Sequence, residues 1–181
     1  RVSRGLGDVY KRQPLKLTFY MAIFVAIPYL MFELWKFVSP GLFKTEKIYT
    51  ISLTGLSTVL FYLGTFFAFF VVFPLIFSFF INSAPEGVAV MTDISSYLNF
   101  VIKLLVAFGL AFQMPIVIFT LVKSEIASIE ALSNARPYII IGCFIFGMLL
   151  TPPDVISQTL LAVPTWTLFE LGLLGARLIK T

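Results

Sequence analysis

Histidine is missing from the 181 residues, and cysteine occurs once, at Cys143 within an apolar run. Without histidine the chain has no Ser–His nucleophile pair, no His-based metal site and no H-E-x-x-H helix of the kind that binds zinc in proteases. A single cysteine excludes a disulfide framework within the chain. A G-x-x-x-x-G-K-[ST] loop is also missing, so the chain has no P-loop for nucleotide hydrolysis. Several common classes of enzyme are therefore excluded.

Charged side chains are scarce in this chain. They make up 12% of the residues, whereas hydrophobic residues make up 59% and phenylalanine alone contributes 21 residues. Soluble domains usually contain about 25% charged and roughly 45–50% apolar residues. A globule of 20.3 kDa cannot bury so many large apolar side chains, so the composition predicts an integral membrane protein.

Long apolar runs define the predicted fold. A helix needs about 20 mostly apolar residues to cross a hydrocarbon core roughly 30 Å thick. The runs predict an all-α integral membrane protein with five transmembrane helices, at about 17–35, 51–80, 95–122, 137–151 and 155–176. Four helices are expected to bend at a proline, namely Pro28, Pro74, Pro115 and Pro164. No inverted repeat of the kind found in many secondary transporters is visible.

Basic residues alternate along the predicted connections. The segment after the first helix has three lysines, the next connection has no Lys or Arg, the third has two, the last corner has none and the tail has two. Lys and Arg are enriched in cytoplasmic loops. The pattern therefore predicts that segments 36–50 and 123–136 and the C terminus are cytoplasmic, with 82–96 and 151–155 outside.

The first residues do not fit this alternation. Residues 1–16 contain five basic side chains, yet five helices would place them outside. A missing first helix preceded by a cytoplasmic N terminus would restore the pattern. We therefore expect 1–13 to be a foreign leader and 14–181 to form a single transmembrane domain.

Several local patterns occur in unbroken order: "FELWKFVSPGLFKTEK", "FVVFPLIFSFF", "APEGV…TDISSYL", "FGLAFQMPIVI", "RPYIIIG" and "GMLLTPPDVISQTLLAVPTWTLFELG". Together they resemble the TatC family, the multi-spanning core subunit of the twin-arginine protein translocase. TatC proteins have six transmembrane helices with both ends cytoplasmic, so this chain resembles helices two to six.

The resemblance implies a function in protein export and not an enzymatic one. It implies recognition of twin-arginine signal peptides and transport of folded proteins, driven by the protonmotive force, with no cofactor. The implied partners are the single-span subunits TatA and TatB, other TatC copies, signal peptides of folded cargo and the lipid bilayer, but not nucleic acid. The implied location is the plasma (inner) membrane of a prokaryote, with the thylakoid membrane as a weaker alternative.

Phe37 and Glu46 match the positions that family members use to bind the signal peptide. A carboxylate suits the guanidinium of an arginine, and an aromatic face can pack against it. The alternative is that Glu46 neutralises Lys44 and Lys47, and that Phe37 belongs to an interfacial aromatic belt. Trp35 is expected to belong to an interfacial aromatic belt.

Gln113 lies well inside the third predicted helix, just before Pro115. In TatC relatives this position is Glu or Gln on a concave, water-accessible face. Two interpretations stay open: a polar site with a role in transport, or an interhelical hydrogen bond worth about 0.6 kcal/mol on average. An uncharged amide does not suit a direct carrier of protons. Glu33 and Glu170, near the cytoplasmic helix ends, are expected to be structural.

The corner between the last two helices contains Pro152, Pro153 and Asp154. The prolines end one helix, and Asp154 is placed to cap the next by accepting from its first N–H groups. The run from 137 to 150 would be about 21 Å long at 1.5 Å per residue, short of a full hydrocarbon core. The outer end of this hairpin therefore stops short of a full hydrocarbon core unless the bilayer thins.

Met148, Thr151 and Gln158 match the polar patch with which TatC relatives dock single-span partner subunits. Polar side chains facing lipid need a partner, and a second helix can supply one. The alternative is that Thr151 and Gln158 bond to each other across the hairpin.

Two other classes of function agree less well with these residues. A small-solute secondary transporter or channel subunit would need charged sites at the membrane midplane and internal repeats, and neither is evident. An intramembrane aspartyl protease would need two facing aspartates, whereas Asp93 and Asp154 both lie at the predicted outer edge.

Overall fold

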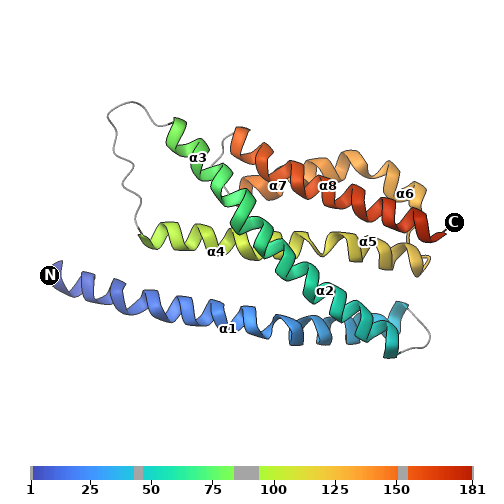
Figure 1. Ribbon diagram of the computed structural model, residues 1–181, viewed down its shortest axis with the longest axis horizontal. Helices are drawn as coiled ribbons and strands as arrows, with labels where there is room; N and C mark the ends of the chain where they lie inside the picture. The colour runs from blue at the N-terminus through green and yellow to red at the C-terminus, as the bar shows by residue number, and fades with distance from the viewer. Residues whose placement is uncertain (1, 43–46, 84–93, 151–154, 181) are drawn as a thin grey trace.

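The computed structural model describes residues 2–42, 47–83, 94–150 and 155–180, and these residues form a bundle of helices (Figure 1). The elements are α1 (Val2–Leu42), α2 (Lys47–Phe67), the π-helix η1 (Ala68–Val72), α3 (Phe73–Ser83), α4 (Ile94–Ala111), α5 (Met114–Lys123), α6 (Ile129–Asn134), α7 (Arg136–Leu150) and α8 (Val155–Lys180). The predicted all-α class is confirmed.

Four stretches of these helices are long and apolar enough to cross a membrane, namely Pro14–Val38, Thr50–Phe79, Ser96–Lys123 and Gln158–Leu178. They agree closely with four of the predicted transmembrane helices. The fifth, α7, is apolar but has only 15 residues, so it extends about 22 Å at 1.5 Å per residue. Helix α1 begins at Val2 and so extends beyond the predicted span at its N-terminal end. The origin of residues 1–13 stays a prediction.

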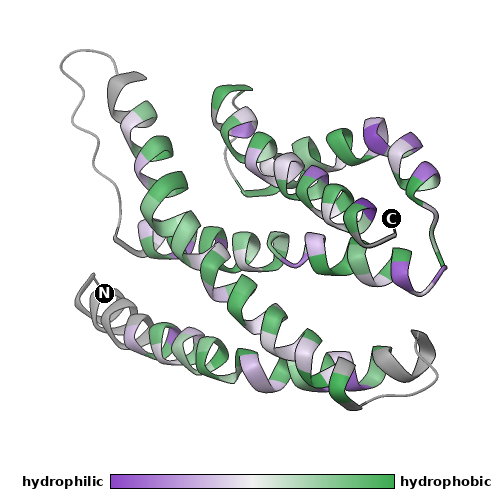
Figure 2. Cartoon of the chain, turned by 45° about the vertical axis from the view of Figure 1, so that its right-hand side comes forward, coloured by the Kyte–Doolittle hydropathy of each residue, from purple (hydrophilic) through white to green (hydrophobic). Residues whose placement is uncertain are grey.

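The helix ends fall into two groups at opposite ends of the bundle. At one end lie the end of α1, the start of α2, α6 and the end of α8, and at the other lie the end of α3, the start of α4 and the start of α8 (Figure 1). The described parts of the segments predicted to be cytoplasmic therefore share one end. Hydrophobic residues cover most of the helices, whereas strongly hydrophilic ones gather near α6 and the C terminus (Figure 2).

Two prolines interrupt the main-chain ladder where a bend was predicted. Pro74 has no N–H to offer the carbonyl one turn earlier, and the helix widens just before it into η1, where Phe73 N–H donates to Ala68 O. Pro115 follows the break between α4 and α5. Pro28 and Pro164 lie within α1 and α8, which continue through them.

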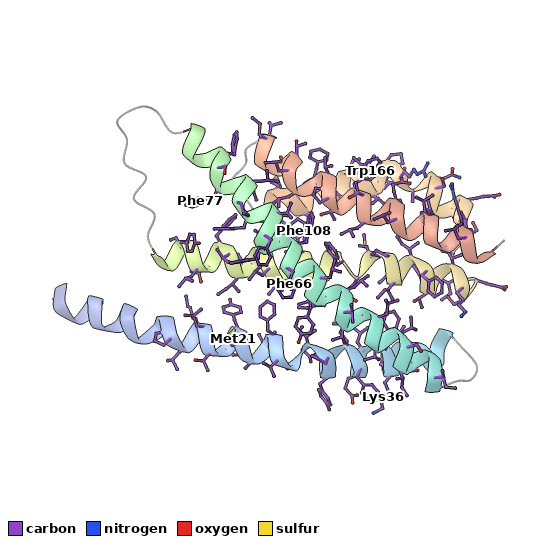
Figure 3. All side chains as sticks on the ribbon, viewed as in Figure 1. Met21, Lys36, Phe66, Phe77, Phe108 and Trp166 are labelled. Carbon is purple, nitrogen blue, oxygen red and sulfur yellow. The ribbon has the colours of Figure 1, made fainter. Side chains whose placement is uncertain are left out.

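Two glycines let the backbones of α2 and α4 approach closely. A Cβ atom on Gly64 would lie 2.6 Å from the carbonyl oxygen of Phe108, and one on Gly109 would lie 2.6 Å from the ring of Phe61. Phe61 and Phe108 are fully buried, and Phe108 lies at the centre of the bundle (Figure 3). Small residues at such crossings are typical of membrane helices, whose association depends on close van der Waals contact.

The core consists of three clusters of buried side chains. The largest joins η1, α3, α4 and α8, the second joins α1, α2 and α5, and the third joins α5 and α8. Helix α1 packs mainly on α2, and between residues 14 and 38 many of its apolar side chains are exposed. Such a surface is suited to contact with lipid or another apolar helix.

The short helix α6 was not predicted from the sequence. The Ser128 hydroxyl caps it by accepting from Ala131 N–H at 3.1 Å. Before it, Glu125 turns the chain with φ = 60°, a conformation usual at the C-terminal end of helices but seldom adopted by residues other than Gly or Asn.

Candidate functional site

Gln113 lies at the break between α4 and α5. Its own N–H donates to Leu110 O at 3.0 Å, one residue closer than the regular helical partner, Gly109 O. Pro115, at the start of α5, offers no N–H to Ala111 O. The predicted disturbance of the ladder at this point is confirmed, and it places the Gln113 side chain where backbone carbonyls are accessible.

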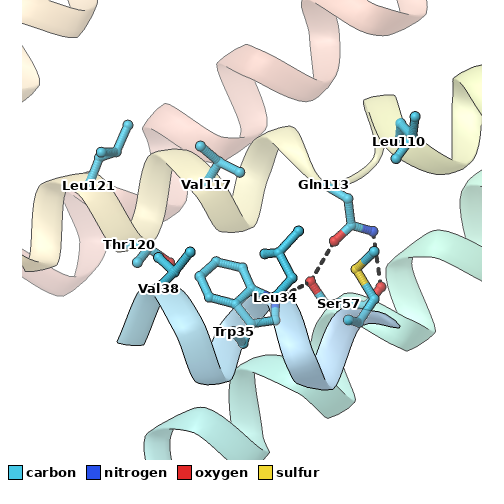
Figure 4. Close-up of a pocket in the computed structure, with 10 residues that line it drawn as sticks. Leu34, Trp35, Val38, Ser57, Leu110, Gln113, Val117, Thr120 and Leu121 are labelled. Carbon is cyan, nitrogen blue, oxygen red and sulfur yellow. Dashed lines mark hydrogen bonds between the residues drawn. The ribbon is translucent and has the colours of Figure 1, made fainter. Parts of the chain in front are cut away.

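The Gln113 amide bonds directly to α2 and, through Ser57, is linked to α1 (Figure 4). The Ser57 hydroxyl of α2 donates to Gln113 Oε1, and Gln113 Nε2 donates to Ser57 O at 3.0 Å and to Gly109 O at 3.4 Å. Trp35 of α1 completes the group, because its Nε1–H donates to Ser57 Oγ at 2.8 Å. We call Trp35, Ser57 and Gln113 the polar triad. The interhelical hydrogen bond, one of the two interpretations of Gln113, is therefore present.

A cavity of about 360 Å³ lies against the polar triad, between α1, α2, α4 and α5. Apart from the triad, most of its lining is aliphatic: Met31, Leu34, Val38, Leu110, Val117 and Leu121 (Figure 4). The Thr120 hydroxyl, also in the lining, donates to Ile116 O in its own helix. The cavity therefore presents mainly hydrocarbon, with the triad as its polar part.

The residues predicted near the signal-binding loop have different environments. Phe37, in the last turns of α1, has 86% of its surface exposed and does not line the cavity. Glu46 lies outside the described residues. The belt prediction for Trp35 is wrong, because its side chain is 4% exposed and points into the bundle towards Ser57. The packing of α1 on α2 buries the face of α1 that carries the indole.

The hairpin of α7 and α8 holds the residues predicted to dock partner subunits. Gln158 Nε2 donates across the hairpin to Phe144 O at 2.8 Å. The helices touch here, since a Cβ atom on Gly147 would lie 3.0 Å from Gln158 O. Met148 is half exposed. Outside the described residues lie Thr151 and the corner residues Pro152, Pro153 and Asp154.

An ion pair that the sequence did not predict joins the other end of this hairpin. Arg136 Nε lies 2.8 Å from Glu170 Oε1, and a second nitrogen of the guanidinium donates to Oε2 at 2.9 Å. The side chains of Arg136 and Glu170 are 40% and 23% exposed. Glu33 pairs with Lys36 at 3.5 Å on the exposed surface of α1. The structural roles expected for Glu33 and Glu170 agree with these pairs.

No metal centre is evident in the residues that the structure describes, where no group of three or more His, Cys, Asp or Glu lies close enough to hold an ion. The polar triad likewise consists of neutral groups. Hydrogen bonding and apolar contact are thus the interactions that this region offers.

Comparison with known proteins identifies the family. The model of the family "Sec-independent protein translocase protein (TatC)" matches residues 12–164. The chain belongs to the TatC family. It is 55% identical over 164 residues to the TatC protein of Haemophilus influenzae, covering 91% of this chain and 64% of that protein. It is 49% identical to the TatC protein of Escherichia coli K12, with the same coverage of 91% and 64%.

The fold of a solved TatC structure agrees with the one described above. A crystal structure of the "Twin Arginine Translocase Receptor- TatC in DDM" superposes with a TM-score of 0.81 at 34% identity, covering 89% of this chain and 72% of the other. The chain thus spans a little less than two thirds of the length of the two curated relatives and has the architecture of the solved TatC protein.

Proposed function

We propose that this chain is a core receptor subunit of the twin-arginine translocase. In this function it binds twin-arginine signal peptides and nucleates assembly of the translocon, which exports folded proteins across a prokaryotic plasma membrane using the protonmotive force. The observation that carries the proposal is the match, over 89% of the chain, to a structure described as the twin-arginine translocase receptor. The comparisons support this reading over a small-solute transporter or channel.

Signal-peptide binding is assigned to the connection between α1 and α2. Phe37 supports this assignment because it is 86% exposed at the end of the bundle where α1 ends and α2 begins. An exposed ring at this position can pack against an arginine or an apolar segment of a peptide. Glu46 would supply the carboxylate for a bidentate pair with a guanidinium.

Charge reversal at Glu46 tests this assignment. In the full chain in detergent micelles, Glu46→Lys should lower the affinity for a twin-arginine peptide by tenfold or more, because an attractive partner becomes a repulsive one. The matched control is Glu130→Lys, which changes the charge of the exposed helix α6 at the same end by the same amount. A twin-lysine peptide provides the second control, since lysine lacks the planar fork of arginine. Equal peptide affinity in the two variants would contradict the proposal and leave Glu46 as a neutraliser of lysines.

Docking of single-span subunits is assigned to the α7–α8 hairpin at Met148, Thr151 and Gln158. The half-exposed Met148 offers an apolar contact, and the carbonyl oxygen of the Gln158 amide offers an acceptor to a polar group of a partner helix. The Gln158 Nε2 group already donates within the hairpin, to Phe144 O. Part of the role of Gln158 is therefore to hold α7 on α8, so that the docking surface is preformed.

The orientation in the membrane follows from the distribution of charge. The end of the bundle with the end of α1, the start of α2, α6 and the end of α8 holds the lysines and arginines of the segments predicted to be cytoplasmic, which favours its placement in the cytoplasm. The short α7 then approaches the outer surface at the corner of Pro152, Pro153 and Asp154. Gln113 would serve as the polar site at membrane depth.

A further inference from the structure

Hydrogen-bond direction within the polar triad is determined by its chemistry. An indole Nε1–H can only donate, so Trp35 donates and Ser57 Oγ accepts. The Ser57 hydroxyl then has its own proton to donate, and Gln113 Oε1 receives it. The polarity of the chain of bonds therefore runs one way, from α1 through α2 to the break between α4 and α5.

The same contacts fix which way the Gln113 amide faces. Its Nε2 points towards two carbonyl oxygens, those of Ser57 and Gly109. The flipped amide would place Oε1 against both carbonyls, where no proton is available to bond them. Only one orientation of the Gln113 amide bonds the Ser57 hydroxyl and the carbonyl oxygens of Ser57 and Gly109 together.

The Gln113 side chain also takes the place of its own backbone N–H as a hydrogen-bond donor. Its backbone N–H has moved to Leu110 O, and its Nε2 reaches Gly109 O, the carbonyl that a regular helix would pair with that N–H. The break between α4 and α5 is therefore stabilised from the side by a residue that is itself held from α2.

We propose that Trp35 and Ser57 are positioning residues, which hold the Gln113 amide in one orientation at the α4–α5 break and so fix the polar wall of the adjoining cavity. Trp35 and Ser57 are almost completely buried, so water does not compete for the bond between them. The positioning of Gln113 follows from the contacts among these three residues. Any role of Gln113 in transport rests on the proposed function.

The two tryptophans of the chain allow a direct spectroscopic test. Within the described part of the chain, Trp166 Nε1 is buried without a hydrogen-bond partner, whereas Trp35 Nε1 is bonded to Ser57. A ¹⁵N-labelled sample of the full chain in detergent micelles should give two indole signals. The signal lost in Trp35→Phe should lie at lower field in the proton dimension than the signal of Trp166, because hydrogen bonding deshields the indole proton.

Ser57→Ala removes the central hydroxyl and should move the Trp35 indole signal upfield. It should also speed hydrogen exchange of that indole by about threefold to tenfold, the range expected for one lost hydrogen bond. The matched control is Thr58→Ala, which removes a hydroxyl from the next residue of α2 that bonds only to Thr54 O in its own helix. Neither change should appear in that control.

Trp35→Phe gives a second, milder perturbation, read at the side-chain amide of Gln113. Loss of the indole donor should shift the two Gln113 amide protons, although Trp35 reaches Gln113 only through Ser57. An unchanged Trp35 indole in Ser57→Ala, or unchanged Gln113 amide signals in Trp35→Phe, would overturn the inference. Peptide affinity is measured separately through Glu46, so failure of these spectra would leave the proposed receptor function standing.

Discussion

Replacing Gly64 by alanine tests how closely α2 and α4 approach. The added Cβ would lie 2.6 Å from the carbonyl oxygen of Phe108, which belongs to the backbone and cannot rotate away. Gly55, in the same helix, has nothing within 4 Å of an added Cβ and is the matched control. The two variants share the same chemical change and differ in the space available.

The magnitude follows from two opposing terms. Alanine is favoured over glycine inside a helix by about 1 kcal/mol, and this gain applies to both variants. Overpacking at Gly64 costs about 1–3 kcal/mol, since a backbone must move to relieve it. Gly55→Ala should therefore be more stable than the unchanged chain. The free energy of unfolding of Gly64→Ala should be about 1–3 kcal/mol lower than that of Gly55→Ala. For a chain of this size the difference corresponds to roughly 2–12 °C in the unfolding midpoint.

Thermal unfolding of the purified chain in one detergent, followed by tryptophan fluorescence, measures this difference. Gly109→Ala should fall between the other two, because its Cβ would meet the ring of Phe61 and not a backbone atom. A midpoint for Gly64→Ala equal to or above that of Gly55→Ala would refute the close approach of the two helices.

Two further outcomes concern the α7–α8 hairpin. Glu170→Gln should raise the rate of thiol labelling at the buried Cys143 by roughly 5- to 30-fold. The ion pair that it removes, Arg136–Glu170, is partly buried. Its contribution therefore lies between that of surface pairs, about 0–1 kcal/mol, and the cost of disrupting buried pairs, about 3–5 kcal/mol. Glu33→Gln, which removes the exposed pair on α1, should change the labelling rate by less than about twofold. Gln158→Leu should weaken disulfide crosslinking from a cysteine at Met148 to a single-span partner by roughly tenfold, and equal crosslinking would confine Gln158 to a role inside the hairpin.

The fold was largely predictable because membrane helices are defined by length and apolarity. Runs of about 20 apolar residues set four of the helices, and the prolines at 74 and 115 located two interruptions of the ladder. The π-helix before Pro74 was not predictable, since a missing N–H can be accommodated by a kink, a break or a wider turn. The choice depends on how η1 packs against α4, which is a tertiary effect.

The candidate site was predictable only in part. The sequence showed that Gln113 needs partners but did not identify Ser57, which is one of several hydroxyl residues in α2. Its neighbours Thr54, Thr58 and Thr65 bond to carbonyls of their own helix. Only the rotation of α2 against α4 selects the hydroxyl that faces Gln113. The prediction that Trp35 faces the membrane interface was wrong for the same reason. An aromatic residue near a membrane surface can face either lipid or protein, and the sequence does not decide between them.

The surroundings of Gln113 also indicate why an amide occupies this position. The site offers one hydroxyl donor and two carbonyl acceptors, and an amide matches them with one acceptor atom and two N–H donors. An ionised carboxylate has no donor, so it would face the oxygens of Ser57 and Gly109 with like partial charge in a water-poor interior. The hydrogen-bonding pattern thus favours a neutral group that donates and accepts at once. In this chain Gln113 connects the α4–α5 break directly to α2 and, through Ser57, to α1, and its uncharged amide does not suit a direct carrier of protons.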